Sequence, residues 1–185
     1  AFSDKVGRPS TKLSVIKIGG NVIEDDLKLD LFLSQFVKIA DPKIIVHGGG
    51  KKATEISEKL GIKTEMNNGR RITPKANLDV ITMVYGGLIN KTIVAQLQAK
   101  SCNAMGLTGA DANCISAVKR PAVPIDFGYV GDIKSVNAEA INNFLNTGIT
   151  PVFCAISHDQ NGQLLNTNAD TIASEIAIAM NNDYD

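Results

Sequence analysis

Short apolar runs alternate with amphipathic stretches along most of the chain. The apolar runs "LSVIKI" (13–18), "KIIV" (43–46) and "ITPVFCAI" (149–156) have the length and β-branched content of buried strands. Weaker strand patterns lie at 103–109, 112–118 and 127–133. Apolar residues at helical spacing predict helices at 26–40, 51–60, 75–99, 137–148 and 171–180. Because strands and helices alternate, the pattern predicts an α/β fold with a mostly parallel, open sheet sandwiched by helices.

Turn residues separate these predicted elements. Gly61 follows the helix at 51–60 and is a good residue to end it. Asn68-Gly69 lies between polar arms and predicts a hairpin. Thr73-Pro74 precedes the longest helical pattern, so Thr73 is the expected N-cap and Pro74 the first helical residue.

Composition and charge narrow the class of protein. The chain has 185 residues, the length of one α/β domain, with 19 basic and 19 acidic side chains. A net charge of zero gives no reason to expect nucleic acid or an anionic membrane as a partner. No run of 18 apolar residues exists, so no membrane span is expected. The three cysteines lack metal-ligand spacing and indicate reduced thiols of a cytoplasmic protein.

The first twelve residues differ from the rest. They contain no apolar core of a secretory signal, and we expect residues 1–12 to form a flexible tail. Residues 13–185 are then the folded domain. No further strand follows the last predicted helix, so the sequence resembles the front part of a larger protein.

Two glycine clusters end predicted strands and precede predicted helices. They are "KIGG" (17–20) and "HGGG" (47–50). Glycine costs about 0.5–1 kcal/mol relative to alanine in regular structure, so bare backbone must have a use here. Tight turns are one explanation. A second is an anion site, because free N–H groups at a helix start attract phosphate or carboxylate. The spacing fits neither a dinucleotide-binding motif nor a P-loop.

Several polar residues have two possible explanations. Lys17 lies inside a predicted buried strand, so it needs a partner: a structural ion pair, or phosphates held at Gly19 and Gly20. His47 is predicted to be packed and hydrogen-bonded rather than a catalytic base, and His158 to be solvated. Arg71 follows the hairpin turn, and its neighbour Arg70 is its natural control.

"NTNAD" (166–170) places Asn166, Asn168 and Asp170 on one side if the backbone is extended. Asp170 alone would suffice as an N-cap for the last helix. The two asparagines then remain for a ligand that has both donors and acceptors.

These motifs together resemble the amino-acid kinase family, in the branch that acts on N-acetyl-L-glutamate. The matching segments run in family order over nearly the whole chain: "KIGG" (17–20), "HGGG" (47–50), "NGRRITP" (68–74), "INKTIV" (89–94), "FGYVGDI" (127–133) and "GQLLNTNAD" (162–170). The resemblance implies an amino-acid kinase-like fold whose C-terminal nucleotide half, with its adenine and ribose site, is absent from this sequence. We therefore expect this chain alone to be inactive.

The resemblance also implies a reaction and roles for individual residues. The reaction is ATP-dependent phosphorylation of the side-chain carboxylate of N-acetyl-L-glutamate, or of another N-acylglutamate, in arginine biosynthesis. Mg²⁺ accompanies ATP, and no protein-held metal is implied. The implied catalytic residues are Lys17 and Asp170. The implied substrate-binding residues are Gly49, Gly50, Arg71, Asn166 and Asn168. The implied phosphate-binding residues are Gly19, Gly20 and Gly48.

Other interpretations remain open. The chain could be another amino-acid or carbamate kinase of the same superfamily, although "NGRRITP" argues against that. It could also be a non-catalytic module that binds acylamino acids. A homodimer is expected, with the helix at 75–99 as its candidate contact.

Overall fold

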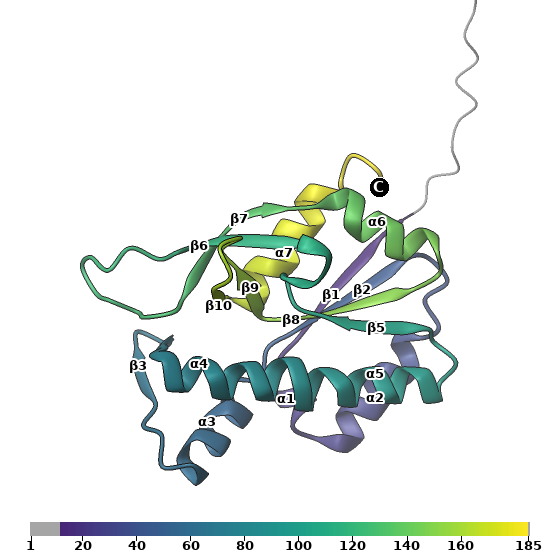
Figure 1. The fold of residues 1–185 in the computed structure, drawn as a ribbon. Helices are drawn as coiled ribbons and strands as arrows, with labels where there is room; N and C mark the ends of the chain where they lie inside the picture. The colour runs from purple at the N-terminus through teal and green to yellow at the C-terminus, as the bar shows by residue number, and fades with distance from the viewer. Residues whose placement is uncertain (1–11, 185) are drawn as a thin grey trace, which may run out of the picture.

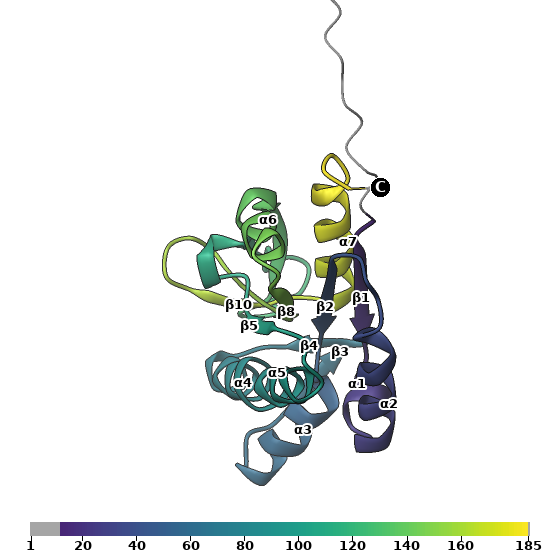
Figure 2. The same cartoon turned by 90° about the vertical axis from the view of Figure 1, so that its right-hand side faces the viewer.

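The computed structural model describes residues 12–184. A central sheet lies between two layers of helices (Figure 1), and the side view shows the same three layers (Figure 2). The expected α/β sandwich is therefore confirmed. Of the expected tail, residues 1–11 lie outside the described residues.

The central sheet has four parallel strands in the order β1-β2-β8-β5. Their bounds are β1 Ser14–Ile18, β2 Lys43–His47, β8 Thr150–Cys154 and β5 Ala104–Leu107. The middle strands β2 and β8 are almost entirely buried, which explains their continuous apolar sequences. The predicted parallel sheet is confirmed, and its order places β1 at an edge.

Helices cover both faces of this sheet. One layer holds α1 Gly20–Ile23, α2 Asp26–Phe36, α3 Gly50–Lys59 and a long helix built from α4 Lys75–Ile81, η1 Thr82–Ile89 and α5 Asn90–Ala99. The other layer holds α6 Ala138–Asn146 and α7 Ala169–Met180. All five predicted helices are present, and the short helix α1 is an addition to the predicted set.

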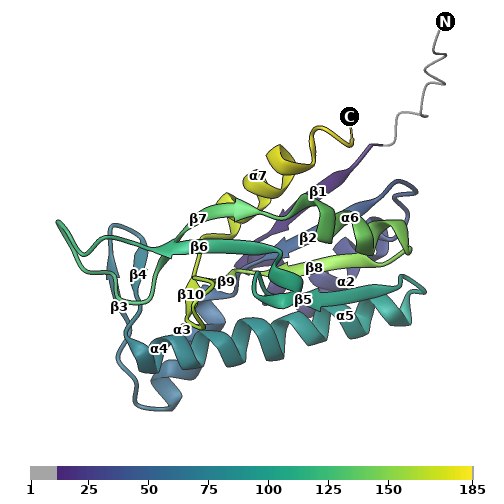
Figure 3. The ribbon, with the colours of Figure 1, turned by 45° about the horizontal axis from the view of Figure 1, so that its top comes forward.

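A second four-stranded sheet extends beyond the first, and sequence patterns did not predict it as a separate unit. Its order is β10-β9-β6-β7, with antiparallel outer pairs. The bounds are β6 Ile115–Lys119, β7 Gly131–Val136, β9 Ile156–His158 and β10 Leu164–Asn166, and a 3₁₀ turn, η2 Asp111–Asn113, precedes β6. The β6–β7 connection projects to the same end of the molecule as the small hairpin of β3 Glu65–Asn67 and β4 Arg70–Ile72 (Figure 3).

Local turn chemistry agrees with the sequence at the hairpin. Asn68 and Gly69 both have positive φ, 47° and 77°, as a two-residue hairpin turn requires. Gly61 ends α3 with φ 70°, also as predicted.

Two predicted helix caps are wrong. Pro74, not Thr73, is the N-cap of α4, because Thr73 is fully buried and donates its hydroxyl to the Arg71 carbonyl. Asn168, not Asp170, caps α7 by accepting a hydrogen bond from the Thr171 N–H at 2.9 Å. The second correction leaves the Asp170 carboxylate available for another partner.

The long helix from Lys75 to Ala99 is mixed in type. Its middle segment η1 is π-helical, so its backbone hydrogen bonds join residues five apart rather than four. By length and a mean hydropathy of 1.3 it is the one helix in the described part of the chain that could cross a membrane. Its buried side chains, including Val84, Ile93 and Leu97, belong to the core beneath the sheet.

Candidate active site

The two glycine turns lie side by side at the carboxyl ends of adjacent strands. In the β1–β2 ladder Ile18 pairs with His47, so Gly19 and Gly48 follow at the same level. Both turns line one cavity of about 490 Å³. Ligands of open parallel sheets bind at such strand ends. The fold therefore brings together the two clusters that the sequence singled out.

Gly49 is the one glycine in these turns whose backbone demands glycine. Its φ of 147° is rare for other residues, and a Cβ atom there would lie 2.2 Å from Ile89 Cδ1. A Cβ at Gly19 would be 3.6 Å from Lys17 Nζ and one at Gly20 would be 3.4 Å from Glu24 Oε1, which are ordinary contacts. Tight packing explains Gly49, whereas Gly19 leaves open backbone beside the Lys17 ammonium and Gly20 lies beside the Glu24 carboxylate.

Lys17 points from the end of β1 toward the start of α7. Its Nζ lies 3.1 Å from Asp170 Oδ1, and its side chain is 32% exposed. The expectation that Lys17 is buried is therefore wrong, because β1 is an edge strand. The expected ion-pair partner exists, and the ammonium also lies beside Gly19. The lysine charge is thus held beside the first glycine turn.

Arg71 extends from β4 across to the start of α3. One guanidinium nitrogen donates to the Gly50 carbonyl at 2.7 Å and to Thr54 Oγ1 at 2.8 Å. The other donates to Thr64 Oγ1 at 3.3 Å. Arg70 also lines the cavity but is exposed. Of the two neighbouring arginines, Arg71 is therefore the one that the fold fixes in place.

Asn166 and Asn168 line the cavity with different tasks. Asn166 ends β10 and donates its amide to Thr73 Oγ1 at 3.1 Å. Asn168 is exposed and uses its Oδ1 as the cap of α7. The predicted extended backbone is present at Asn166, which ends β10, and at Asn168, with φ −85° and ψ 127°, but not at Asp170, which already lies in α7. All three side chains still line the same cavity.

Sequence reasoning missed Arg120 and Tyr85, which line the same cavity. Arg120 makes a two-pronged ion pair with Asp132, and this pairing lowers the pKa of that carboxyl. Asp132 belongs to the "FGYVGDI" segment, so its charge was a signal that a basic partner existed. Tyr85 is buried, and its hydroxyl lies near Gly50, where a Cβ would be 3.6 Å away.

The remaining reactive side chains are unsuited to nucleophilic or base catalysis. The three cysteines are buried, and burial raises the pKa of Cys114 to about 11 and that of Cys154 to about 12. Burial lowers the pKa of His47 to about 4, so its ring is neutral at pH 7. His158 ends β9, is half-exposed and hydrogen-bonds the exposed Asn113 at 2.9 Å.

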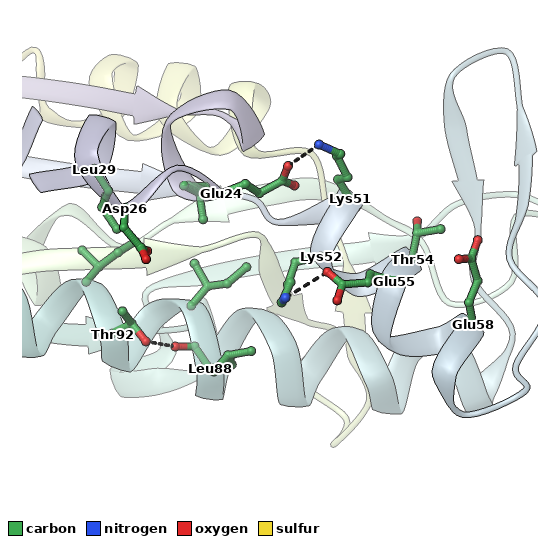
Figure 4. Close-up of a pocket in the computed structure, with 13 residues that line it drawn as sticks. Glu24, Asp26, Leu29, Lys51, Lys52, Thr54, Glu55, Glu58, Leu88 and Thr92 are labelled. Atoms are coloured by element: carbon green, nitrogen blue, oxygen red, sulfur yellow. Dashed lines mark hydrogen bonds and ion pairs between the residues drawn. The ribbon is translucent and has the colours of Figure 1, made fainter.

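A larger cavity of about 670 Å³ lies on the helix layer, outside the glycine cavity (Figure 4). Two ion pairs, Lys51–Glu24 and Lys52–Glu55, cross it, and apolar side chains such as Leu29 and Leu88 line it. None of the residues predicted for the site lines this cavity. Size alone therefore does not identify the site.

The cavity at the glycine turns is strongly basic. Lys17, Arg70, Arg71 and Arg120 line it, while Asp170 is the one acidic residue in its lining. Among residues 12–184 no three His, Cys, Asp or Glu side chains come together as a metal site. Lys17 and Arg120 are paired with carboxylates, so Arg70 and Arg71 carry the excess positive charge at this cavity.

Comparison with protein families shows to which family the chain belongs. The model of the amino acid kinase family matches residues 12–184, and the chain belongs to that family. It is 55% identical over 170 residues to the acetylglutamate kinase of Cytophaga hutchinsonii, covering 91% of this chain and 64% of that protein. It is 51% identical over 174 residues to the acetylglutamate kinase of Bacteroides thetaiotaomicron, covering 94% and 68%. The chain thus spans about two thirds of the length of these relatives.

Solved structures have the same fold. The structure of smu.665 from Streptococcus mutans superposes with a TM-score of 0.81 at 27% identity, covering 91% of this chain and 69% of that one. N-acetylglutamate synthase from Neisseria gonorrhoeae, complexed with coenzyme A and N-acetyl-glutamate, superposes with a TM-score of 0.77 at 18% identity. It covers 92% of this chain and 39% of that one, and it supports the fold alone.

Proposed function

We propose that this chain is the substrate- and phosphate-binding part of a kinase that transfers the γ-phosphoryl group of ATP to the side-chain carboxylate of N-acetyl-L-glutamate. The observation that carries the proposal is the convergence of Lys17, Arg71 and two glycine turns on one basic cavity. The relatives named acetylglutamate kinase, at 51–55% identity, support the choice of acceptor.

The cavity suits an acceptor with two carboxylates. Arg71 would hold the α-carboxylate of the substrate, because its guanidinium is already fixed by Gly50 and Thr54. Asn166 and Asn168 would contact the acylamino group, which offers one donor and one acceptor. The N–H groups of Gly49 and Gly50 would face the oxygens of the reacting carboxylate and of the phosphoryl group.

Phosphoryl transfer depends on positioning and on neutralising charge rather than on a protein nucleophile. One bond forms between the acceptor carboxylate oxygen and phosphorus as the bond from phosphorus to the ADP oxygen breaks. Lys17 would neutralise charge on the phosphoryl group in transit, and Asp170 would hold the lysine in place. Gly19, Gly20 and Gly48 would hold phosphate oxygens. All of these residues line the cavity.

ATP is the co-substrate in this proposal, with Mg²⁺ supplying charge neutralisation at its phosphates. The adenine and ribose contacts, and a further lysine, would come from the third of the relatives' length that this chain does not span. Residues 13–185 would then be one domain of a cytoplasmic enzyme of arginine biosynthesis.

A homodimer through the long helix belongs to the same proposal. Met83 and Leu88 are more than half exposed on that helix, and exposed apolar side chains favour a protein contact. Light scattering on the full-length protein, with Leu88→Glu as the disrupting variant, would measure this state.

A hydroxamate assay for acyl phosphate tests the function. Full-length protein with ATP, Mg²⁺ and N-acetyl-L-glutamate should form product, whereas carbamate or unacylated L-glutamate should give at most a small fraction of that rate. Other N-acylglutamates, tested in parallel, define the acyl group. The 185-residue chain alone should be inactive. Substrate binding without product in the full-length protein would favour a binding module, and preference for carbamate would favour another kinase of the family.

A further inference from the structure

The "INKTIV" segment has no part in the proposed function so far, yet it holds a buried polar chain beneath the glycine turns. Asn90 begins α5 and is 1% exposed. Its Nδ2 lies 3.0 Å from His47 Nε2 and 2.9 Å from the Val152 carbonyl oxygen. Its Oδ1 accepts from Lys91 Nζ at 3.1 Å. Every polar atom of this amide therefore has a partner.

These partners fix the orientation of the Asn90 amide. A carbonyl oxygen only accepts hydrogen bonds, so the Val152 carbonyl must face the NH₂ group, and the Lys91 ammonium must face the oxygen. The second amide hydrogen then points to His47 Nε2, which has to accept it. Gly106 makes room for this arrangement, because a Cβ there would lie 1.8 Å from Asn90 Oδ1.

The orientation of Asn90 decides the tautomer of His47. A ring that accepts at Nε2 and is neutral carries its proton on Nδ1. Nδ1 lies 2.8 Å from the Gly48 carbonyl oxygen, which accepts a hydrogen bond from this N–H. His47 is 0% exposed, so no water competes for either nitrogen. One arrangement of hydrogens satisfies the whole chain from Val152 to Gly48.

The Gly48 carbonyl shares a peptide plane with the Gly49 N–H. In a trans peptide these two groups point in opposite directions. Anchoring the carbonyl to the buried ring therefore turns the Gly49 N–H away from the core. No residue of the described chain 12–184 accepts a hydrogen bond from that N–H, and Gly49 lines the cavity.

We propose that Asn90 and His47 are positioning residues, which orient the Gly49 N–H toward the group that is transferred in the cavity. The inference rests on the proposed function for its catalytic consequence, whereas the tautomer stands on hydrogen bonding alone. Asn90 and His47 touch no ligand in this scheme. They act through the Gly48–Gly49 peptide.

The tautomer has a direct spectroscopic test. In ¹⁵N-histidine NMR of the full-length protein at pH 7, the signals that disappear in His47→Gln assign the two ring nitrogens of His47. The expected result is a proton on Nδ1 of His47 and none on Nε2. In Asn90→Leu this preference should weaken. A proton on Nε2 in the unmodified protein overturns the inference, whatever the reaction is.

Two replacements of His47 test the catalytic consequence. The amide nitrogen of asparagine can take the place of Nδ1 and still donate to the Gly48 carbonyl, whereas that of glutamine reaches the place of Nε2. His47→Gln should lower kcat about ten- to hundredfold, below the 10²–10³ typical of deleting an oxyanion donor. His47→Asn should retain clearly more activity, and the KM for N-acetyl-L-glutamate should change little in either.

A further variant tests whether a loss of stability alone would lower kcat. Asn137→Ala removes the side-chain cap of α6, which does not line the glycine cavity, and should leave kcat unchanged. Equal kcat in His47→Asn and His47→Gln, with the folded state verified by circular dichroism, would overturn the positioning role. An unmodified protein that forms no acyl phosphate would refute the proposed function instead, and the NMR result would still decide the tautomer.

Discussion

The ammonium of Lys17 and the carboxylate of Asp170 form an ion pair, 3.1 Å apart, that joins the edge strand of the sheet to the first turn of α7. Asp170 is 69% exposed, so water screens the pair. Such pairs typically stabilise a protein by about 0–1 kcal/mol. A pair of this kind adds little to stability, so the catalytic role proposed for Lys17 can be tested without unfolding the protein.

Replacing Lys17 by alanine separates these two roles. We expect kcat in the full-length protein to fall by at least about 10², because a cation that meets developing charge is lost. The KM for N-acetyl-L-glutamate should change little. The free energy of unfolding should change by less than about 1 kcal/mol. Steady-state kinetics measures kcat and KM, and urea unfolding measures the free energy of unfolding.

Lys100→Ala is the matched control for that prediction. Lys100 pairs with Asp30 at 2.6 Å with similar exposure of the two side chains, but both lie outside the glycine cavity. The kcat of Lys100→Ala should equal that of the unmodified protein. An unchanged kcat in Lys17→Ala as well would leave Lys17 with a structural role only.

Arg71→Ala should weaken substrate binding. A charge-assisted grip on a carboxylate is worth on the order of 2–4 kcal/mol, so KM for N-acetyl-L-glutamate should rise roughly 30-fold or more. Arg70→Ala should raise KM far less, because Arg70 is exposed and the fold does not fix it. Equal effects of the two substitutions would mean that Arg71 is not the carboxylate-binding arginine.

Gly49→Ala should destabilise the fold. The new Cβ would lie 2.2 Å from Ile89 Cδ1 at a φ of 147°, so both packing and backbone must adjust. Overpacking of this kind costs about 1–3 kcal/mol, and the backbone strain adds to it. Gly87→Ala is the comparison, since nothing lies within 4 Å of its added Cβ. Thermal unfolding should show a lower Tm for the first variant and an equal or higher Tm for the second.

Stability should fall in mild acid because of His47. Burial lowers its pKa from 6.5 to about 4 in the folded state. Between these pH values the unfolded chain binds a proton that the folded chain does not bind, so the free energy of unfolding decreases as pH falls from 6.5 to 4. The full effect is about 3 kcal/mol. This contribution to the free energy of unfolding is fully present above pH 6.5 and is lost as the pH falls to the folded-state pKa of His47, about 4.

Carboxylates also titrate in part of this pH range, so the quantity to measure is the difference in the free energy of unfolding between two variants. Urea unfolding of the unmodified protein and of His47→Asn at several pH values isolates the histidine contribution. The two curves should converge as the pH is lowered. Parallel curves would show that the folded protein binds a proton at His47 as readily as the unfolded chain does.

Much of the fold could be predicted from hydrophobic periodicity and turn residues. The parallel strands, the five long helices and the hairpin at Asn68-Gly69 follow from local signals. The position of β1 at the sheet edge could not be predicted, because strand order depends on pairings between distant segments. For that reason Lys17 was expected to be buried.

The candidate site could be predicted in part, where residue type alone carried the chemistry. The glycine turns, Lys17 and Arg71 lie in one cavity, as their types suggested. Arg120 was missed because it enters the cavity from the second sheet, which the sequence did not predict as a unit. The task of Asn168 was misassigned because either Asn168 or Asp170 could cap α7, and the backbone position of the cap cannot be read from residue type.

The π-helical segment Thr82–Ile89 fixes the number of residues that must lie between α4 and α5. Deleting one residue there would restore α-helical bonding and rotate every later side chain by roughly 100° about the helix axis. Asn90 would then no longer reach the ring of His47, and Ile93 would turn away from the core. Homologous chains that keep this site should therefore vary in side chains across the segment but not in residue number, and an alignment gap there would mark a chain whose glycine turn is supported differently.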